Sequence, residues 1–81
     1  MHVNILGSNQ CEIVTEHGKY LQSYKSIVAK KDYGEITLYP KWDYSRTTAK
    51  HVGKWLGKSS KEIREKIKQG EIIVEKYEPE L

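Results

Sequence analysis

The sequence predicts an α+β fold, in which an antiparallel β-meander of three to four strands precedes two short helices and a final strand. Two observations predict it. Over the first forty residues, β-branched and aromatic residues alternate with polar ones, as in strands that bury one face. After Trp42, apolar residues recur about every four positions, as in helices that bury one side. Because the chain has only 81 residues, we expect residues 1–81 to form a single domain.

Strands are expected at residues 11–16, 19–31 and 35–39, with residues 2–6 as an additional edge strand. Asp32-Tyr33-Gly34 predicts a hairpin turn before the third of these strands, because glycine accepts a positive φ. Along residues 19–31 the alternation places two sets of side chains on opposite faces. One set is Tyr20, Gln22, Tyr24, Ser26 and Val28, and the other is Leu21, Ser23, Lys25, Ile27 and Ala29.

The two helices are expected between Ser45 and Gly70. Ser45 suits the N-cap of the first helix, because its hydroxyl accepts a hydrogen bond from an unpaired backbone N–H, and Gly57 suits the C′ position. Ser59 and Glu62 match the S-x-x-E capping box that begins the second helix. The inward side chains are then Thr48, Ala49, Val52, Trp55, Leu56, Ile63 and Ile67. Residues 72–74 return to the sheet as the final strand.

Charge is unevenly distributed along the chain. Residues 1–40 have four basic and four acidic side chains, whereas residues 41–70 have nine basic and three acidic ones, a net charge of +6. Residues 71–81 have a net charge of −3. The segment expected to be helical therefore carries a positive field that attracts anionic partners.

The basic side chains of this segment form two rows. Arg46, Lys50 and Lys54 recur every four residues on the first helix, and Lys58 extends their row. Lys61, Arg64 and Lys68 form the second row at spacings of three and four. Each basic side chain that contacts a phosphate releases counterions, so two adjacent rows suit a nucleic-acid-binding surface. The alternative is that they only hydrate the outer face of a helix pair.

The aromatic residues are six Tyr and two Trp, with no Phe, so every ring has a polar tip. Tyr20, Tyr24 and Tyr39 are candidates for a platform on which bases stack, or for a patch that binds a protein. The alternative is that these rings are covered in the core beneath the helices.

Several classes of site are not expected. The single cysteine, Cys11, allows no intramolecular disulfide, which favours a reducing, cytoplasmic setting. His2, His17 and His51 are far apart and lack further ligands at metal-binding spacing, and no glycine-rich phosphate loop is present. No nucleophile, base and orienting group form a set. We therefore expect no catalytic residues, no metal and no cofactor, and the longest apolar run, three residues, excludes a membrane span.

Residues 47–72 read TTAKHVGKWLGKSSKEIREKIKQGEI. This stretch resembles the helix-turn-helix of excisionase-type and mercury-regulator-type winged helices, through Val52, Leu56, Gly57, Ser59, Ile63, Arg64, Ile67, Gly70 and Ile72. The resemblance implies that the second helix enters the major groove and presents Lys61, Arg64, Glu65 and Lys68. Two positions depart from the pattern: Lys58 replaces an apolar residue, and Gly53 replaces the usual Ala.

Two further stretches share a pattern of their own. Residues 20–29 and 44–56 contain Tyr-Leu-Gln-Ser-Tyr, Ile-Val-Ala, Tyr-Ser-Arg-Thr-Thr-Ala-Lys-His and Trp-Leu. This pattern, S-Y-x-[ST]-x-V-A followed by Y-S-x-T-T-x-K-H, resembles that of small, mostly uncharacterised proteins of bacteriophages and other mobile elements. The resemblance implies an accessory protein in the cytoplasm of a host cell.

Together these features predict a non-enzymatic mobile-element protein that binds nucleic acid through its basic helix pair, as a small transcription regulator. The competing hypothesis is a protein-binding inhibitor of a host factor or defence system, of the anti-CRISPR kind, that contacts an acidic host surface. A homodimer is a further expectation, because small regulators commonly dimerise and a terminal edge strand offers a pairing surface.

Overall fold

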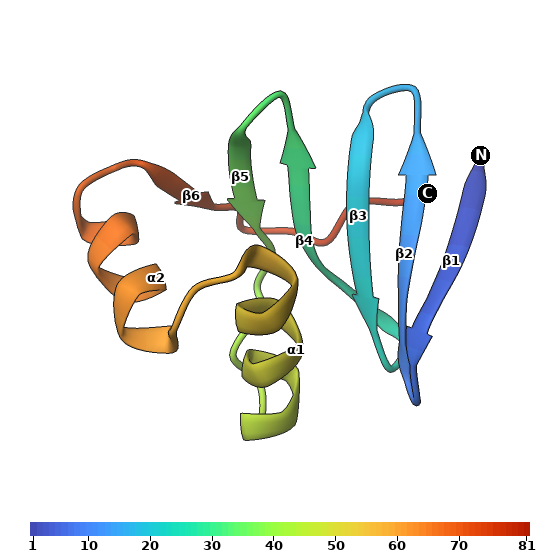
Figure 1. Cartoon of the computed structure of the whole chain (residues 1–81). Coiled ribbons are helices and arrows are strands. Elements are labelled where there is room, and N and C mark those ends of the chain that lie inside the picture. Colours follow the sequence, from blue (N-terminus) through green and yellow to red (C-terminus); the bar gives the residue numbers. More distant parts are fainter.

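The computed structural model describes all of residues 1–81 and contains one six-stranded sheet and two helices, which confirms the α+β class (Figure 1). In chain order the elements are β1 (His2–Gly7), β2 (Gln10–Thr15), β3 (Gly18–Ser23), β4 (Ser26–Asp32), β5 (Glu35–Leu38), α1 (Arg46–Leu56), α2 (Ser60–Lys68) and β6 (Ile72–Val74). Neither helix has the length and apolar character that crossing a membrane requires.

The strands lie in the sheet in the same order as in the chain. The first five pair as antiparallel neighbours, so the meander has five strands, and the expectation of three to four was too low. β6 pairs with β5 in parallel, because the connection through α1 and α2 brings the chain back to the end at which β5 began. β1 is therefore one edge of the sheet and β6 the other (Figure 1).

The expectation of a single strand at residues 19–31 was wrong. Tyr24 and Lys25 form a tight turn between β3 and β4, with Tyr24 at a left-handed φ of 57°. The register also shifts between Leu21 and Gln22, so β4 has one more residue than β3 in this interval. This bulge changes the predicted faces: Val28 packs with Leu21, and Ile27 packs with Tyr20.

The main core lies between the sheet and the helices. It comprises Leu21, Val28, Ala29, Leu38, Trp42, Val52, Ile63 and Ile72. Five of the seven helical positions predicted to point inward belong to this core or pack against it, namely Val52, Trp55, Leu56, Ile63 and Ile67. The helices are thus held to the sheet by the apolar stripe that the sequence predicts, which leaves their basic side chains at the surface.

A second cluster lies on the opposite face of the sheet and consists of Ile13, Tyr20, Ile27 and Tyr39. Figure 1 shows the chain after β6 passing behind the strands, on the side away from α1. Tyr20 and Tyr39 are only 7% and 6% exposed, and burial raises the pKa of Tyr39 to about 12. Of the two alternatives for these rings, Tyr20 and Tyr39 follow the covered one, although on the face of the sheet away from the helices, and only Tyr24 lies at the surface.

Both helices begin at the predicted N-caps, but the second half of the predicted capping box does not form, because the Glu62 carboxylate pairs with Lys58 and not with the Ser59 N–H. The Ser45 hydroxyl accepts a hydrogen bond from the Thr48 N–H at 3.1 Å, and the Ser59 hydroxyl accepts one from the Glu62 N–H at 3.1 Å. Gly57, at a φ of 69°, ends α1, and the Lys58 N–H reaches back to the Gly53 carbonyl. A Cβ at Gly53 would lie 2.7 Å from the Lys58 carbonyl oxygen, so glycine at this position permits the close turn into α2.

Candidate nucleic-acid interface

A groove of about 580 Å³ lies where the N-terminal ends of α1 and α2 meet. We call it the helix-junction groove, and its lining residues are Asp43, Ser45, Arg46, Thr47, Ala49, Lys50, Ser60 and Arg64. Three of the predicted site residues, Arg46, Lys50 and Arg64, are therefore brought to one place. Because both helices begin here, the positive ends of two helix dipoles add to the charge of these side chains.

The cations of the groove differ in their partners. Arg46 and Lys50 are exposed and make no ion pair. The Arg64 guanidinium lies 3.3 Å from the Asp43 carboxylate and 5.1 Å from the centre of the Trp42 ring. Asp43 and Trp42 thus hold Arg64 in place, and the Asp43 carboxylate partly neutralises its charge. Asp43 is the one carboxylate that lines the groove.

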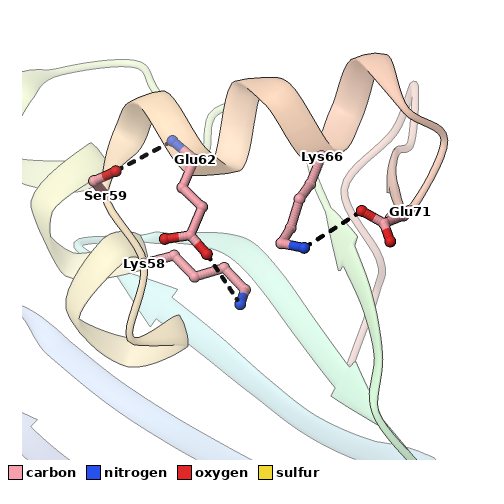
Figure 2. A network of polar contacts seen from close by, with 5 residues as sticks. All are labelled: Lys58, Ser59, Glu62, Lys66 and Glu71. Carbon is pink, nitrogen blue, oxygen red and sulfur yellow. Dashed lines mark hydrogen bonds and ion pairs between the residues drawn. The ribbon is translucent and has the colours of Figure 1, made fainter.

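A second group of basic side chains lies on α2 and beside its ends, and each of them pairs with a nearby glutamate. Figure 2 shows Lys58 beside Glu62, at 3.6 Å, and Lys66 beside Glu71, at 3.3 Å. We call these four residues the paired surface of α2. Lys58, a predicted site residue, therefore faces a carboxylate. Glu62 is four residues from both Lys58 and Lys66, and in the structure it pairs with Lys58. The remaining predicted cations, Lys54, Lys61 and Lys68, are exposed and line neither this surface nor the groove.

A second groove, of about 750 Å³, opens at the turn between β3 and β4. We call it the tyrosine groove, because the rings of Tyr24 and Tyr44 line it together with the lysines Lys25 and Lys41. No carboxylate lines it, and hydroxyl groups from Ser23, Ser26, Ser45 and Thr48 complete it. Tyr44, Lys25 and Lys41 were not predicted as site residues, because only the turn at Tyr24 brings this part of the sheet to the beginning of α1.

A polar contact joins β3 to α1 behind this groove. Ser23 Oγ lies 2.8 Å from His51 Nδ1 and 3.4 Å from Thr48 Oγ1, and Ser23 is only 2% exposed. Every polar atom that is buried here has a partner, so the contact fixes α1 against the sheet without leaving an unpaired group. The neighbouring ring of Tyr24 is 6.1 Å from the His51 ring.

The other end of α1 is also fixed by polar contacts. The Trp55 Nε1–H donates to a Glu12 carboxylate oxygen at 2.8 Å, and this hydrogen bond is the main reason why the pKa of Glu12 is lowered. Lys31 lies over the Trp55 ring at 4.1 Å from its centre. These contacts set the position of α1, and with it the position of Arg46 and Lys50, relative to the sheet.

No group of three or more His, Cys, Asp and Glu side chains is arranged to hold a metal ion. A family model described as "Family of unknown function (DUF8033)" matches residues 1–73, so the chain belongs to that family. The matched residues include both helices and both grooves. No curated protein and no solved structure matches the chain.

Proposed function

We propose that this member of the DUF8033 family is a non-enzymatic protein that binds nucleic acid through the helix-junction groove. The observation that carries the proposal is that Arg46 and Lys50, both without an ion-pair partner, share one groove with Arg64 and with the first turns of two helices. Guanidinium groups, ammonium groups and helix N-termini are all used by proteins to bind phosphate oxygens. A groove that combines them suits a phosphate backbone.

The surroundings of the groove favour an extended polyanion over a single small anion. Lys54, Lys61 and Lys68 are exposed on the same two helices and have no carboxylate partner. A backbone that passes through the groove therefore meets further positive charge on leaving it, and each neutralised phosphate releases counterions.

A regulator of transcription is the role that fits the helix-turn-helix resemblance. In that role α2 reads base edges in the major groove, with Lys61, Arg64, Glu65 and Lys68 on its exposed side and Ile63 and Ile67 against the core. The resemblance to phage and mobile-element proteins is the reason for proposing that this regulator acts in the cytoplasm of a host cell.

The proposal is tested by the fluorescence anisotropy of a labelled duplex and a labelled single strand, titrated with the protein between about 50 and 200 mM salt. We expect log affinity to fall linearly with log salt, with a slope that corresponds to about three or more neutralised phosphates. Absence of binding at the lowest salt, or an affinity that does not change with salt, would contradict it.

A second candidate function is supported by the edge strand β1. Its backbone has no neighbour on one side, it contains no Asp, Glu, Lys, Arg or Pro, and Val3 and Ile5 are 50% and 77% exposed. Edge strands usually carry charged residues that block pairing, so an uncharged one suits strand addition by a host protein or by a second copy of this chain.

The two functions are separated by capture of partners from host lysate with and without nuclease. Partners retained after nuclease treatment, and lost when Val3→Lys and Ile5→Lys are introduced, would favour the inhibitor. Loss of every partner after nuclease treatment would favour the nucleic-acid binder. Sedimentation of the purified protein, with the same two substitutions as the control, tests the homodimer.

A further inference from the structure

The structure points to a second element of recognition, the tyrosine groove, in which we infer that Tyr24 and Tyr44 stack on unpaired bases of a single strand. This inference rests on the proposed nucleic-acid binding and adds a contact for unpaired bases to the contacts proposed for the helix-junction groove and α2. It assigns a role to a groove that the basic rows do not include.

The lining of the tyrosine groove combines exposed aromatic rings with unpaired cations. Tyr24 and Tyr44 are 49% and 78% exposed, although tyrosine rings are favourable to bury. They line one groove with two lysines, Lys25 and Lys41, that have no ion-pair partner, and with no carboxylate. Aromatic rings beside unpaired cations are the combination with which proteins bind single-stranded nucleic acid, because rings stack on bases and cations contact phosphates.

The turn at Tyr24 and the floor of the tyrosine groove are held by hydrogen bonds within the protein. The Tyr24 N–H donates to the Asn9 carbonyl at 2.7 Å, and the Gln22 side-chain amide donates to the Tyr24 carbonyl at 2.9 Å. The floor is fixed by the contact of buried Ser23 with His51. The backbone that carries Tyr24 is therefore held before binding and needs little further ordering when a ligand binds, which favours affinity.

The tyrosine groove adjoins the helix-junction groove. Ser45, at the beginning of α1, lines both grooves. A strand whose phosphates lie against Arg46 and Lys50 therefore passes directly into the tyrosine groove, where its next bases meet the rings. The tyrosine groove, at about 750 Å³, lies within the range of pockets that enclose small molecules, so a nucleoside has room. Bases stacked inside a duplex are not available to such rings, so the tyrosine groove is expected to contact unpaired bases, whereas the helix-junction groove contacts the phosphates of single strands and duplexes alike.

The test compares three labelled probes at one salt concentration: a single-stranded oligonucleotide, an abasic oligonucleotide of equal length, and a duplex. We expect the wild-type protein to bind the base-bearing strand about tenfold or more tighter than the abasic strand. The double variant Tyr24→Leu/Tyr44→Leu is expected to lose this preference and to keep its affinity for the duplex within about twofold, because its phosphate contacts are unchanged. Tyr24→Phe/Tyr44→Phe keeps both rings and is expected to keep the preference.

The matched control is Tyr33→Leu/Tyr77→Leu, which makes the same chemical change at two exposed tyrosines outside both grooves; Tyr33, like Tyr24, has a left-handed φ. This control is expected to behave as the wild type, and circular dichroism checks that each variant is folded. Equal wild-type affinity for the base-bearing and abasic strands overturns the inference while the proposed function stands. A preference that survives in Tyr24→Leu/Tyr44→Leu also overturns it, whereas absence of binding to all three probes overturns the proposed function itself.

Discussion

The helix-junction groove and the paired surface of α2 both carry basic side chains on the same helix pair, but they differ in what faces those side chains. In the groove, Arg46 and Lys50 face no carboxylate within ion-pair distance. On the paired surface, each lysine has a glutamate at 3.3 to 3.6 Å (Figure 2). The net charge of +6 over residues 41–70 is therefore not spread evenly over the helices.

This difference shows why a count of basic residues does not locate a binding surface. An exposed lysine beside a glutamate contributes little to stability, but its field is largely cancelled for an approaching polyanion. A cation without a partner keeps its full field, and its contact with a phosphate releases counterions. The position of carboxylates decides which of the basic rows is available to bind.

The largest expected effect is that of charge reversal in the groove. Arg46→Glu/Lys50→Glu places two carboxylates where phosphates are expected, so affinity for nucleic acid should fall on the order of a hundredfold at low salt. Lys19→Glu/Lys76→Glu changes the net charge equally, outside both grooves, and is the control. Anisotropy titrations measure both, and equal losses in the two variants would show that only net charge matters.

The turn between α1 and α2 sets the position of the two helices relative to each other, and Gly53 is closely packed in it. Gly53→Ala places a Cβ 2.7 Å from the Lys58 carbonyl oxygen, so either the turn or α1 has to move. We expect the free energy of unfolding to fall by about 1–3 kcal/mol, measured by urea denaturation. A stability equal to that of the wild type would mean that the turn is not tightly packed.

Removing the charge of Asp43 would increase the difference between the helix-junction groove and the paired surface, because Asp43 is the groove's one carboxylate. Asp43→Asn removes the only carboxylate of the groove and frees Arg64, so affinity for nucleic acid should rise by about two- to fivefold. Lys66, whose partner is Glu71, supplies the control: Glu71→Gln is expected to change affinity less. If Asp43→Asn lowers affinity, Asp43 acts by positioning Arg64, and neutralisation is not its main effect.

An effect on stability alone is expected at the far end of α1, where a carboxylate contributes to the fold. The Trp55 hydrogen bond holds the pKa of Glu12 below its ordinary value of 4.5, so the stability that this bond contributes is present above pH 4.5 and is lost as the pH falls through the lower folded-state pKa. Trp55→Phe should cost about 1 kcal/mol at pH 7 and flatten this acid dependence. Urea denaturation between pH 3 and pH 7 measures it, and a curve parallel to that of the wild type would contradict the assignment.

Local signals account for the parts of the fold that the sequence predicts well. The caps at Ser45, Gly57 and Ser59 are confirmed, because each depends on residues within one turn of the helix end. The turn at Tyr24 was missed because neither Tyr24 nor Lys25 is a usual turn residue, and the hydrogen bond from the Tyr24 N–H ends on distant Asn9. The resulting bulge then reassigns the faces of Ile27 and Val28.

Of the candidate site, the sequence predicts the exposed cations but not the residues that they contact. Spacing along each helix identifies Arg46, Lys50 and Arg64 as exposed cations, since that depends only on helical periodicity. The ion pair of Arg64 with Asp43, 21 residues away, and the placement of Tyr24 and Tyr44 along one groove depend on how the strands and helices pack together. Sequence periodicity contains no information about such contacts, so the selection among the basic residues required the structure.

The most direct test of the account compares two double alanine variants that remove the same charge from the two regions. Arg46→Ala/Lys50→Ala should reduce the slope of log affinity against log salt by about two, one for each lost phosphate contact. Lys58→Ala/Lys66→Ala should leave this slope unchanged, because each lysine is already paired with a glutamate. Equal reductions in both variants, or an unchanged slope for Arg46→Ala/Lys50→Ala, would contradict the claim that carboxylate partners decide which cations bind nucleic acid.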